Sequence, residues 1–486
     1  MLFNSMQFLF FFAVVVAMYF TIPYHLRWVL LLGASYYFYI SWKPAYVILI
    51  IITTLITYYA GIRMGKIGTK SRRKEILILS LFFNLGFLFV FKYYNFSNDS
   101  LRVIFQHYNL FYGSPALNVV LPIGISFYTF KNLSYTIDVY RGDQSPEKHL
   151  GYLALYVAFF PQLLAGPIER ATRFLPQLYE RFGFDYQRVT KGLKLMLWGL
   201  FQKMVIADNL APLVDSVYND PTHHSGVGLV LATLFFAFQI YCDFAGYSDM
   251  AIGAAQVMGF TTMDNFNRPY FSKSIPEFWR RWHISLSTWF RDYLYIPMGG
   301  NRVSLPRWYF NLFVVLLICG LWHGANWTFI VWGGLHGIYL VFSAFTRNIR
   351  EKVHKAMGLD RVPRLHNYFK VMVTFFLVCF AWIFFRASSI SDAIYIISHL
   401  FTGWEGLAIP ALKATPFFGL LKFHLVVGVV SVGILLLIHL LLGDNHFDQW
   451  LSQERISLRW AVYYSMVLAI LLFGHFGTKE FIYFQF

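Results

Sequence analysis

Apolar stretches about twenty residues long recur along the whole chain. They lie at about residues 5–24, 28–43, 45–62, 75–95, 119–138, 150–165, 189–207, 226–258, 308–345, 368–385, 416–442 and 460–476. A helix needs about 20 apolar residues to cross the roughly 30 Å hydrocarbon core of a bilayer. The sequence therefore predicts an all-α integral membrane protein. Some stretches are too long for one crossing and others are broken by polar residues, so we expect about 11 transmembrane helices plus re-entrant helices.

The composition excludes an ordinary soluble domain. Of the 486 residues, 57% are hydrophobic and only 13% are charged, whereas about 25% are charged in a typical soluble domain. No internal repeat and no soluble insertion interrupts the pattern, so we expect one transmembrane domain over residues 1–486. The first stretch lacks the basic start and cleavage site of a signal peptide, and we expect it to be retained as the first span.

The formal net charge of +16 comes from short basic loops between the apolar stretches, such as "RMGKIGTKSRRKE" and "RNIREKVHKAMGLDRVPR". Loops rich in Lys and Arg stay in the cytoplasm, so we expect both loops inside and the last six residues at the outer face. Topology and contact with membrane lipids account for this charge, and no nucleic-acid partner is expected. Three cysteines, Cys242, Cys319 and Cys379, lack metal-ligand or redox spacing and are expected to be structural thiols.

One stretch, residues 266–302, combines aromatic residues with charge: "FNRPYFSKSIPEFWRRWHISLSTWFRDYLYIPMGGNR". A spanning helix would not face lipid with so many charges. The stretch therefore either lies flat at the membrane interface or enters the protein interior, where broken helices are allowed.

Histidines within apolar sequence are the strongest candidates for chemistry. His323 and His336 lie in "ICGLWHGANWTFIVWGGLHGIYL", and an ionisable residue at membrane depth suggests a functional site. The alternative is a structural histidine bonded to a carbonyl of a neighbouring helix, which is our interpretation of His336. Gly324 and Ala325 leave space beside His323 for another group to approach.

His283, in "RRWHISLS", is the second candidate, although a histidine at the membrane surface would give the same pattern. Two histidines at one cavity can share proton transfer, because imidazole titrates near neutral pH. No third ligand stands at metal spacing, so no metal is expected. Asp243 and Asp249, in "YCDFAGYSDMAIG", are expected to serve packing. A transporter also fits broken helices and buried polar residues, although it would predict the repeats that the sequence lacks.

Four segments together resemble the membrane-bound O-acyltransferase family (MBOAT), and in particular its bacterial branch typified by the alginate O-acetyltransferase membrane subunit. They are "LPIGISFYTF", "YCDFAGYSDMAIG", "FWRRWHISLSTWFRDYLYIP" and "GLWHGANWTFIVWGGLHG", and the resemblance runs over nearly the whole chain. It implies a ring of tilted helices around a central funnel. It also implies that His323 is the essential histidine and His283 the second catalytic position, with Trp322 and Asn326 contacting the substrate.

The resemblance further implies an O-acetyltransferase of the bacterial inner membrane. Cytoplasmic acetyl-CoA is the expected donor, as a substrate rather than a bound cofactor. The expected acceptor is an extracellular or cell-wall polysaccharide of the alginate or peptidoglycan type, reached through an SGNH-hydrolase-type partner at the outer face. The alternative within the class is transfer of D-alanine to teichoic acid.

The last six residues, "FIYFQF", raise a separate hypothesis. In the related D-alanylation system a small separate protein ends in a similar motif around a tyrosine that is proposed to carry the acyl group. By analogy Tyr483 would be an acyl relay, with Phe481, Phe484 and Phe486 seating it. The alternative is an aromatic belt at the membrane interface, where tyrosine and other aromatic residues are common.

Overall fold

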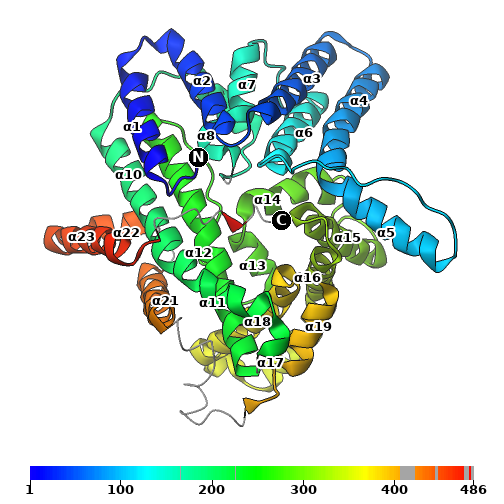
Figure 1. Ribbon diagram of the computed structural model, residues 1–486, viewed down its shortest axis with the longest axis vertical. Helices are drawn as coiled ribbons and strands as arrows, with labels where there is room; N and C mark the ends of the chain where they lie inside the picture. The colour runs from blue at the N-terminus through cyan, green and yellow to red at the C-terminus, as the bar shows by residue number, and fades with distance from the viewer. Residues whose placement is uncertain (165, 225, 405–421, 444–446, 476–480, 483–486) are drawn as a thin grey trace. The chain divides into compact units, whose positions relative to one another are not determined.

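The computed structural model describes residues 1–164, 166–224, 226–404, 422–443, 447–475 and 481–482. Every regular element in these ranges is helical, as the sequence predicts, and Figure 1 shows their order along the chain by colour. They form two compact units, one of Met1–Met196 with Ser248–Met263 and one of Leu197–Tyr247 with Asp264–Phe486. The chain passes between the units inside α10 (Tyr186–Leu200), inside α12 (Gly226–Met258) and again after Met263. The single domain over residues 1–486 stays a prediction.

The first unit contains the N-terminal helices. They are α1 (Met6–Thr21), η1 (Tyr24–Leu26), α2 (Arg27–Ile40), η2 (Pro44–Tyr46), α3 (Val47–Lys66), α4 (Lys70–Leu88), η3 (Phe89–Tyr93), α5 (Tyr94–His107), α6 (Ile125–Arg141), α7 (Leu150–Ala158), α8 (Phe160–Leu163), α9 (Ala171–Phe174) and η4 (Leu175–Tyr179). Helices α3, α4 and α6 pack against one another, and α2 packs against α7. Because α6 is buried at every position from Ile125 to Val139 except Ile137, it is an interior helix rather than a lipid-facing one.

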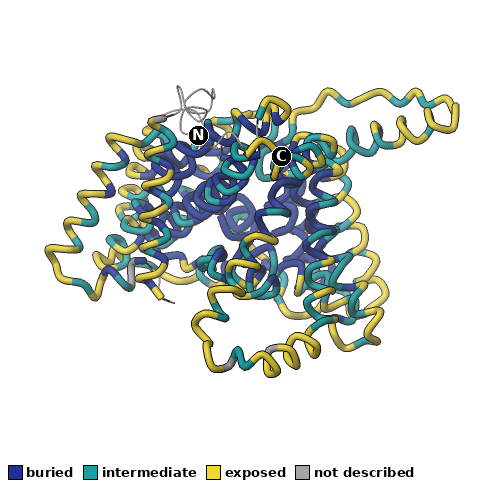
Figure 2. The backbone as a smooth tube through the Cα atoms, turned by 90° about the horizontal axis from the view of Figure 1, so that it is seen from below, coloured by how far each residue is buried: buried dark blue, intermediate teal, exposed yellow. Residues whose placement is uncertain are grey.

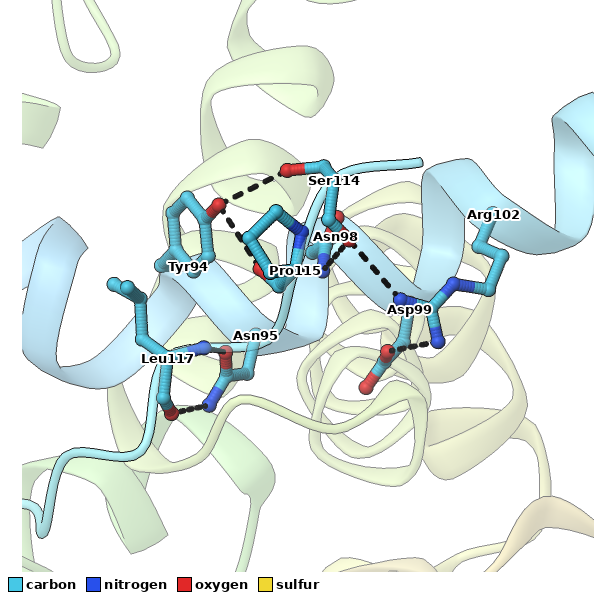
Figure 3. A network of polar contacts seen from close by, with 8 residues as sticks. All are labelled: Tyr94, Asn95, Asn98, Asp99, Arg102, Ser114, Pro115 and Leu117. Carbon is cyan, nitrogen blue, oxygen red and sulfur yellow. Dashed lines mark hydrogen bonds and ion pairs between the residues drawn. The ribbon is translucent and has the colours of Figure 1, made fainter. Parts of the chain in front are cut away.

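The extended segment that follows α5 is fixed to that helix by polar side chains (Figure 3). Asn95 donates from its amide nitrogen to the Leu117 carbonyl at 2.9 Å and accepts from the Leu117 amide at 2.8 Å. The Tyr94 hydroxyl lies 3.0 Å from Ser114 Oγ, and Arg102 donates to the Ser114 carbonyl at 3.2 Å. Side chains on one face of α5 thus replace the backbone partners that this segment would find in a helix.

The second unit holds the C-terminal helices and every described residue of the site. Its elements are η5 (Phe201–Ala207), α11 (Asp208–Tyr218), η6 (Pro221–His223), η7 (Pro269–Phe271), α13 (Ile275–Arg281), α14 (Ile284–Phe290), η8 (Arg291–Tyr295), α15 (Leu305–His323), α16 (Trp327–Phe345), α17 (Arg347–Ala356), η9 (Leu359–Arg361), α18 (Pro363–Arg386), α19 (Ile390–His399), α21 (Lys422–Leu442), α22 (Phe447–Gln453) and α23 (Ile456–Phe473). Helix α16 packs against α13, α15 and α18.

The charged, aromatic stretch at 266–302 forms short helices, and the structure favours its entry into the protein interior. Ser274 caps α13, its Oγ accepting from the Glu277 amide at 3.3 Å. Seven residues make a helix only about 10 Å long, a third of the hydrocarbon core. Phe278, Trp282 and Leu286 are fully buried, so one side of this stretch packs into the protein interior.

Eight helices in the described part of the chain are long and apolar enough to cross a membrane. They are Pro44–Lys66, Lys70–His107, Gly226–Met258, Leu305–His323, Trp327–Phe345, Pro363–Arg386, Phe423–Leu442 and Ile456–Phe473. Exposed positions recur along the helices in Figure 2, and many carry large apolar side chains, such as Phe82, Phe342 and Leu471. Soluble proteins rarely expose so much apolar surface, so the chain is a multi-pass membrane protein. The count of 11 crossings and the central funnel stay predictions.

Candidate functional site

His323 is the last residue of α15, where that helix turns into α16. The two helices approach closely through Gly320 and Gly333, because a Cβ on Gly333 would lie 3.0 Å from the Cα of Gly320 and would collide with the Leu316 carbonyl oxygen. Small residues permit such backbone contact between membrane helices, whose association depends on van der Waals packing. The position of His323 is therefore set by a tightly packed helix pair.

Aromatic rings surround the His323 imidazole, which is only 2% exposed. The ring centroids of Trp322 and Trp332 each lie 5.0 Å from it, and the Phe385 centroid lies 5.4 Å away. All three rings are nearly perpendicular to the imidazole, a favourable edge-to-face geometry. The imidazole is therefore largely enclosed by aromatic rings and shielded from solvent.

His283 occupies the turn between α13 and α14 in an unusual backbone conformation. Its φ of 42° and ψ of 56° lie in the left-handed region, which costs a residue with a side chain roughly 1–2 kcal/mol. Asn265 holds the turn: its carbonyl accepts from the Ile284 amide at 2.9 Å, and its Oδ1 accepts from Ser285 Oγ at 2.9 Å. Backbone strain of this kind is common at functional sites.

The structure brings the two predicted histidines together. The ring centroids of His283 and His323 are 6.3 Å apart, close enough for both imidazoles to contact one bound group. His283 lies outside the eight candidate spans, and burial lowers the pKa of its imidazole to about 3, which makes it neutral at physiological pH. A neutral imidazole can accept a proton or a hydrogen bond.

Phe481 and Ile482 lie beside this pair. The Phe481 ring packs on Tyr247 at 4.6 Å and on Phe244 at 5.4 Å between centroids. Phe244 also lies 4.6 Å from the His283 ring, nearly perpendicular to it. Phe244 therefore contacts both Phe481 and His283. Tyr483 and Phe484, the other predicted residues of this motif, lie outside the described residues, as does Phe486.

The two residues expected to contact substrate differ in their surroundings. Trp322 is buried, with its ring 6.0 Å from that of His283. Asn326 caps α16: its Oδ1 accepts from the Thr328 amide at 3.0 Å, and its Nδ2 donates to the Ser388 carbonyl at 3.3 Å. The structure thus gives Asn326 a helix-capping role. Contact of either residue with substrate stays a prediction.

The interpretation of His336 as bonded to a helix carbonyl is wrong within the described residues, where neither ring nitrogen has a hydrogen-bond partner. The imidazole instead stacks on Phe278, with centroids 5.9 Å apart and planes 10° apart. It also lies 5.2 Å from Trp279 and 5.0 Å from Trp332. His336 is therefore an aromatic packing residue, because the rings of α13 occupy the face where a neighbouring backbone would have to approach.

Asp243 and Lys203 were not predicted as site residues. Asp243 Oδ2 accepts a hydrogen bond of 2.7 Å from the Ile482 amide, and Oδ1 pairs with the Lys203 ammonium. A charge inside the apolar run "YCDFAG" was a signal for Asp243, but its partners are 40 and 239 residues away in sequence.

The three cysteines are free and buried, as expected. Within the described ranges, no three His, Cys, Asp or Glu side chains are grouped so as to hold a metal ion.

Sequence comparisons show which proteins this chain is similar to. A model of the membrane-bound O-acyltransferase family matches residues 40–390. The chain is 40% identical over 447 residues to a probable alginate O-acetylase, AlgI, of Pseudomonas aeruginosa, covering 87% of this chain and 82% of the relative. It is 34% identical over 403 residues to a peptidoglycan O-acetyltransferase of Helicobacter pylori, covering 77% and 74%. A teichoic acid D-alanyltransferase of Bacillus subtilis is 28% identical over 284 residues, covering 56% and 70%.

Proposed function

The chain belongs to the membrane-bound O-acyltransferase family, and from this premise we propose that it acetylates the hydroxyl groups of a polysaccharide outside the cell. Membership makes the chain an enzyme of acyl transfer rather than a transporter. Its similar proteins at 34–41% identity are named for O-acetylation of alginate or peptidoglycan. The D-alanyltransferases are 28% identical and match less of this chain, so transfer of D-alanine is the weaker alternative.

One observation carries the proposal: two buried histidines, with ring centroids 6.3 Å apart, lie close to the aromatic ring on which Phe481 packs. Phe481 belongs to the same short segment as Tyr483, the candidate acyl carrier. His323 is the proposed general base, and His283 the histidine that assists it. A positioned base contributes about 10²–10⁴-fold to such a reaction. The aromatic surroundings keep water away from an intermediate that water would hydrolyse.

The proposed first step moves the acetyl group from acetyl-CoA to Tyr483. The phenolic oxygen attacks the thioester carbonyl while His323 accepts the phenolic proton. The bond between carbonyl carbon and sulfur then breaks, and the departing thiolate takes up the proton. Phenol and thiol have pKa values of roughly 10 and 8.5, so an aryl ester retains much of the transfer potential of a thioester.

The second step delivers the acetyl group outside. An acceptor hydroxyl attacks the tyrosyl acetate, and its proton returns to the phenolic oxygen of Tyr483. The proposed acceptor is a polysaccharide of the alginate or peptidoglycan type, reached through an SGNH-hydrolase-type partner at the outer face of the bacterial inner membrane. The positive-inside rule supports this location, because cytoplasmic basic loops at 63–75 and 347–364 are the basis for expecting residues 481–486 at the outer face.

The proposal is tested by mass spectrometry of the purified protein after incubation with acetyl-CoA. An added acetyl mass on the peptide that contains Tyr483, absent in Tyr483→Phe, is the expected result. Phe keeps the ring and removes only the nucleophilic oxygen, so it is a matched control. If Tyr483→Phe still acetylates polymer in cells at the normal rate, the acetyl group passes to the acceptor without this tyrosine, and residues 481–486 form an interfacial aromatic belt.

A further inference from the structure

Three charged side chains form a buried cluster in the second unit. The Lys203 ammonium, on the π-helical turn η5, pairs with Asp208 Oδ1 at 2.9 Å and with Asp243 Oδ1. All three side chains are at most 4% exposed. A buried ion pair gives little net stability, because the cost of removing its charges from water offsets their attraction. Such a cluster therefore suggests a role beyond stability.

The cluster holds the 481–482 segment through Asp243. While Oδ1 of this carboxylate faces Lys203, Oδ2 accepts the Ile482 amide at 2.7 Å. The same lysine lies 5.5 Å from the centre of the Tyr247 ring, on which Phe481 packs. Asp243 thus binds Ile482, and the Tyr247 ring beside Lys203 packs against the adjacent Phe481.

We propose that Asp243, held by Lys203, is a positioning residue that anchors this segment beside His283 and His323, and this inference rests on the proposed relay through Tyr483. Consecutive Cα atoms are about 3.8 Å apart, so anchoring the Ile482 backbone restricts where the next residue can reach. Reactions in which both groups are held in place gain most from such restriction.

Lys203 gives the anchor its strength. The Lys203 ammonium pairs with Oδ1 of Asp243 and with Oδ1 of Asp208, which leaves Oδ2 of Asp243 to accept from the Ile482 amide. A hydrogen bond to a charged group contributes about twice as much as one between neutral groups. The Asp243 carboxylate binds the backbone amide of Ile482 and not its side chain. It therefore fixes the backbone of the segment at residue 482.

Removing the anchor should free the segment. In Asp243→Ala, Lys203 keeps Asp208 as a partner, so the variant does not leave the lysine unpaired. Hydrogen exchange at the Ile482 amide, resolved by fragmentation mass spectrometry, should rise about 10- to 100-fold, the equivalent of losing one charged hydrogen bond. Acetylation of Tyr483 should slow by at least about tenfold, consistent with the sensitivity of transfer to misplacement of reacting groups. The KM for acetyl-CoA should stay the same. A general structural defect would instead change KM together with the rate.

Three further variants separate anchoring from general damage. Asp208→Asn changes the other carboxylate on Lys203 and keeps the Asp243 carboxylate that accepts from the Ile482 amide, so exchange at Ile482 should stay slow. Ile482→Pro removes the amide donor and leaves the cluster intact, so it should slow acetylation as Asp243→Ala does, while Ile482→Val should not.

Unchanged exchange in Asp243→Ala would overturn the anchor, whatever the activity. Faster exchange with no acetylation of Tyr483 in the wild-type protein would instead keep the anchor and overturn the relay on which its purpose depends.

Discussion

The turn that carries His323 and the turn that carries His283 place their imidazoles by opposite means. His323 ends a regular helix, and its position follows from the close packing of α15 on α16 at Gly320 and Gly333. His283 sits in a left-handed conformation between two helices of seven residues each. Hydrogen bonds accepted by Asn265, about twenty residues earlier in the chain, hold that turn.

The two turns differ in whether the contacts that position the histidine can be altered without altering the imidazole. Around His323, the supporting contacts are steric and involve glycines one or more turns away, so they can be disturbed without touching the imidazole. Around His283, support and strain are both in the backbone of the turn itself. The following changes test each kind of support, from the largest expected effect to the smallest.

His323→Gln should have the largest effect, because it removes the proposed base while keeping a polar side chain of similar reach. Acetylation of Tyr483 from acetyl-CoA should fall by about 10²–10⁴-fold, measured by the initial rate of mass addition. The matched control is His336→Gln, a buried histidine on the adjacent helix α16, which should retain transfer. An equal loss in both variants would mean that aromatic packing, and not base catalysis, is being disturbed.

Gly333→Ala should break the support of His323 without altering the site chemically. A methyl group there would collide with the Leu316 carbonyl oxygen and lie 3.0 Å from the Cα of Gly320. Overpacking of this kind typically costs about 1–3 kcal/mol, seen as a lower midpoint of thermal unfolding in detergent. Gly334→Ala is the neighbouring control, since its methyl would meet only Leu317 Cδ1 at 3.6 Å. Equal midpoints for the two variants would contradict the close-packing explanation.

His283→Ala and His283→Gly form a pair that separates imidazole from backbone. Both remove the ring, so both should lose transfer to the same extent. Only the alanine variant carries the steric cost of the left-handed conformation. The free energy of unfolding should therefore be about 1 kcal/mol higher for His283→Gly than for His283→Ala. Denaturation of both variants in the same detergent measures the difference. Transfer that survives in His283→Gly would show that the ring takes no part in the reaction.

Ser285→Ala should have the smallest effect. It removes the 2.9 Å bond from Ser285 Oγ to Asn265 Oδ1, while the Ser285 amide still donates to the same oxygen at 3.3 Å. Loss of one such bond costs about 0.5–1.5 kcal/mol of unfolding free energy. Ser287→Ala, which deletes a hydroxyl bonded to the Trp282 carbonyl, is the control within the same turn. Transfer should decrease in Ser285→Ala and not in Ser287→Ala, because of these two hydroxyls only that of Ser285 bonds to Asn265.

The sequence predicts well the features that depend on local pattern. Apolar runs indicate the helix α12 and the pair α15 and α16, and charge among aromatic residues marks the broken stretch that becomes α13 and α14. The histidine motifs identify His283 and His323, which the fold places together. Shorter apolar runs, such as the one that becomes the 17-residue interior helix α6, resemble spans because burial in protein and burial in lipid select the same residue types.

Features that depend on distant contacts could not be predicted. The bonds of Asn265 cross 20 residues, and those of Asp243 cross 40 and 239. No local periodicity encodes such pairings. His336 is a second example. Its apolar surroundings in the sequence suggested a hydrogen bond to a helix carbonyl, but its ring contacts Phe278 and Trp279 of α13. The position of α13 depends on contacts throughout the second unit.

Recognition of Ile482 through its backbone amide also has an evolutionary consequence. The hydrogen bond would survive any exchange of this residue for another apolar one except proline, so drift in the identity of residue 482 leaves the contact intact. Asp243 has no comparable freedom, since its two oxygens serve two different partners. A lineage that lost this carboxylate would need a new acceptor for the same amide, and an insertion or deletion next to residue 482 would do more harm than a substitution there.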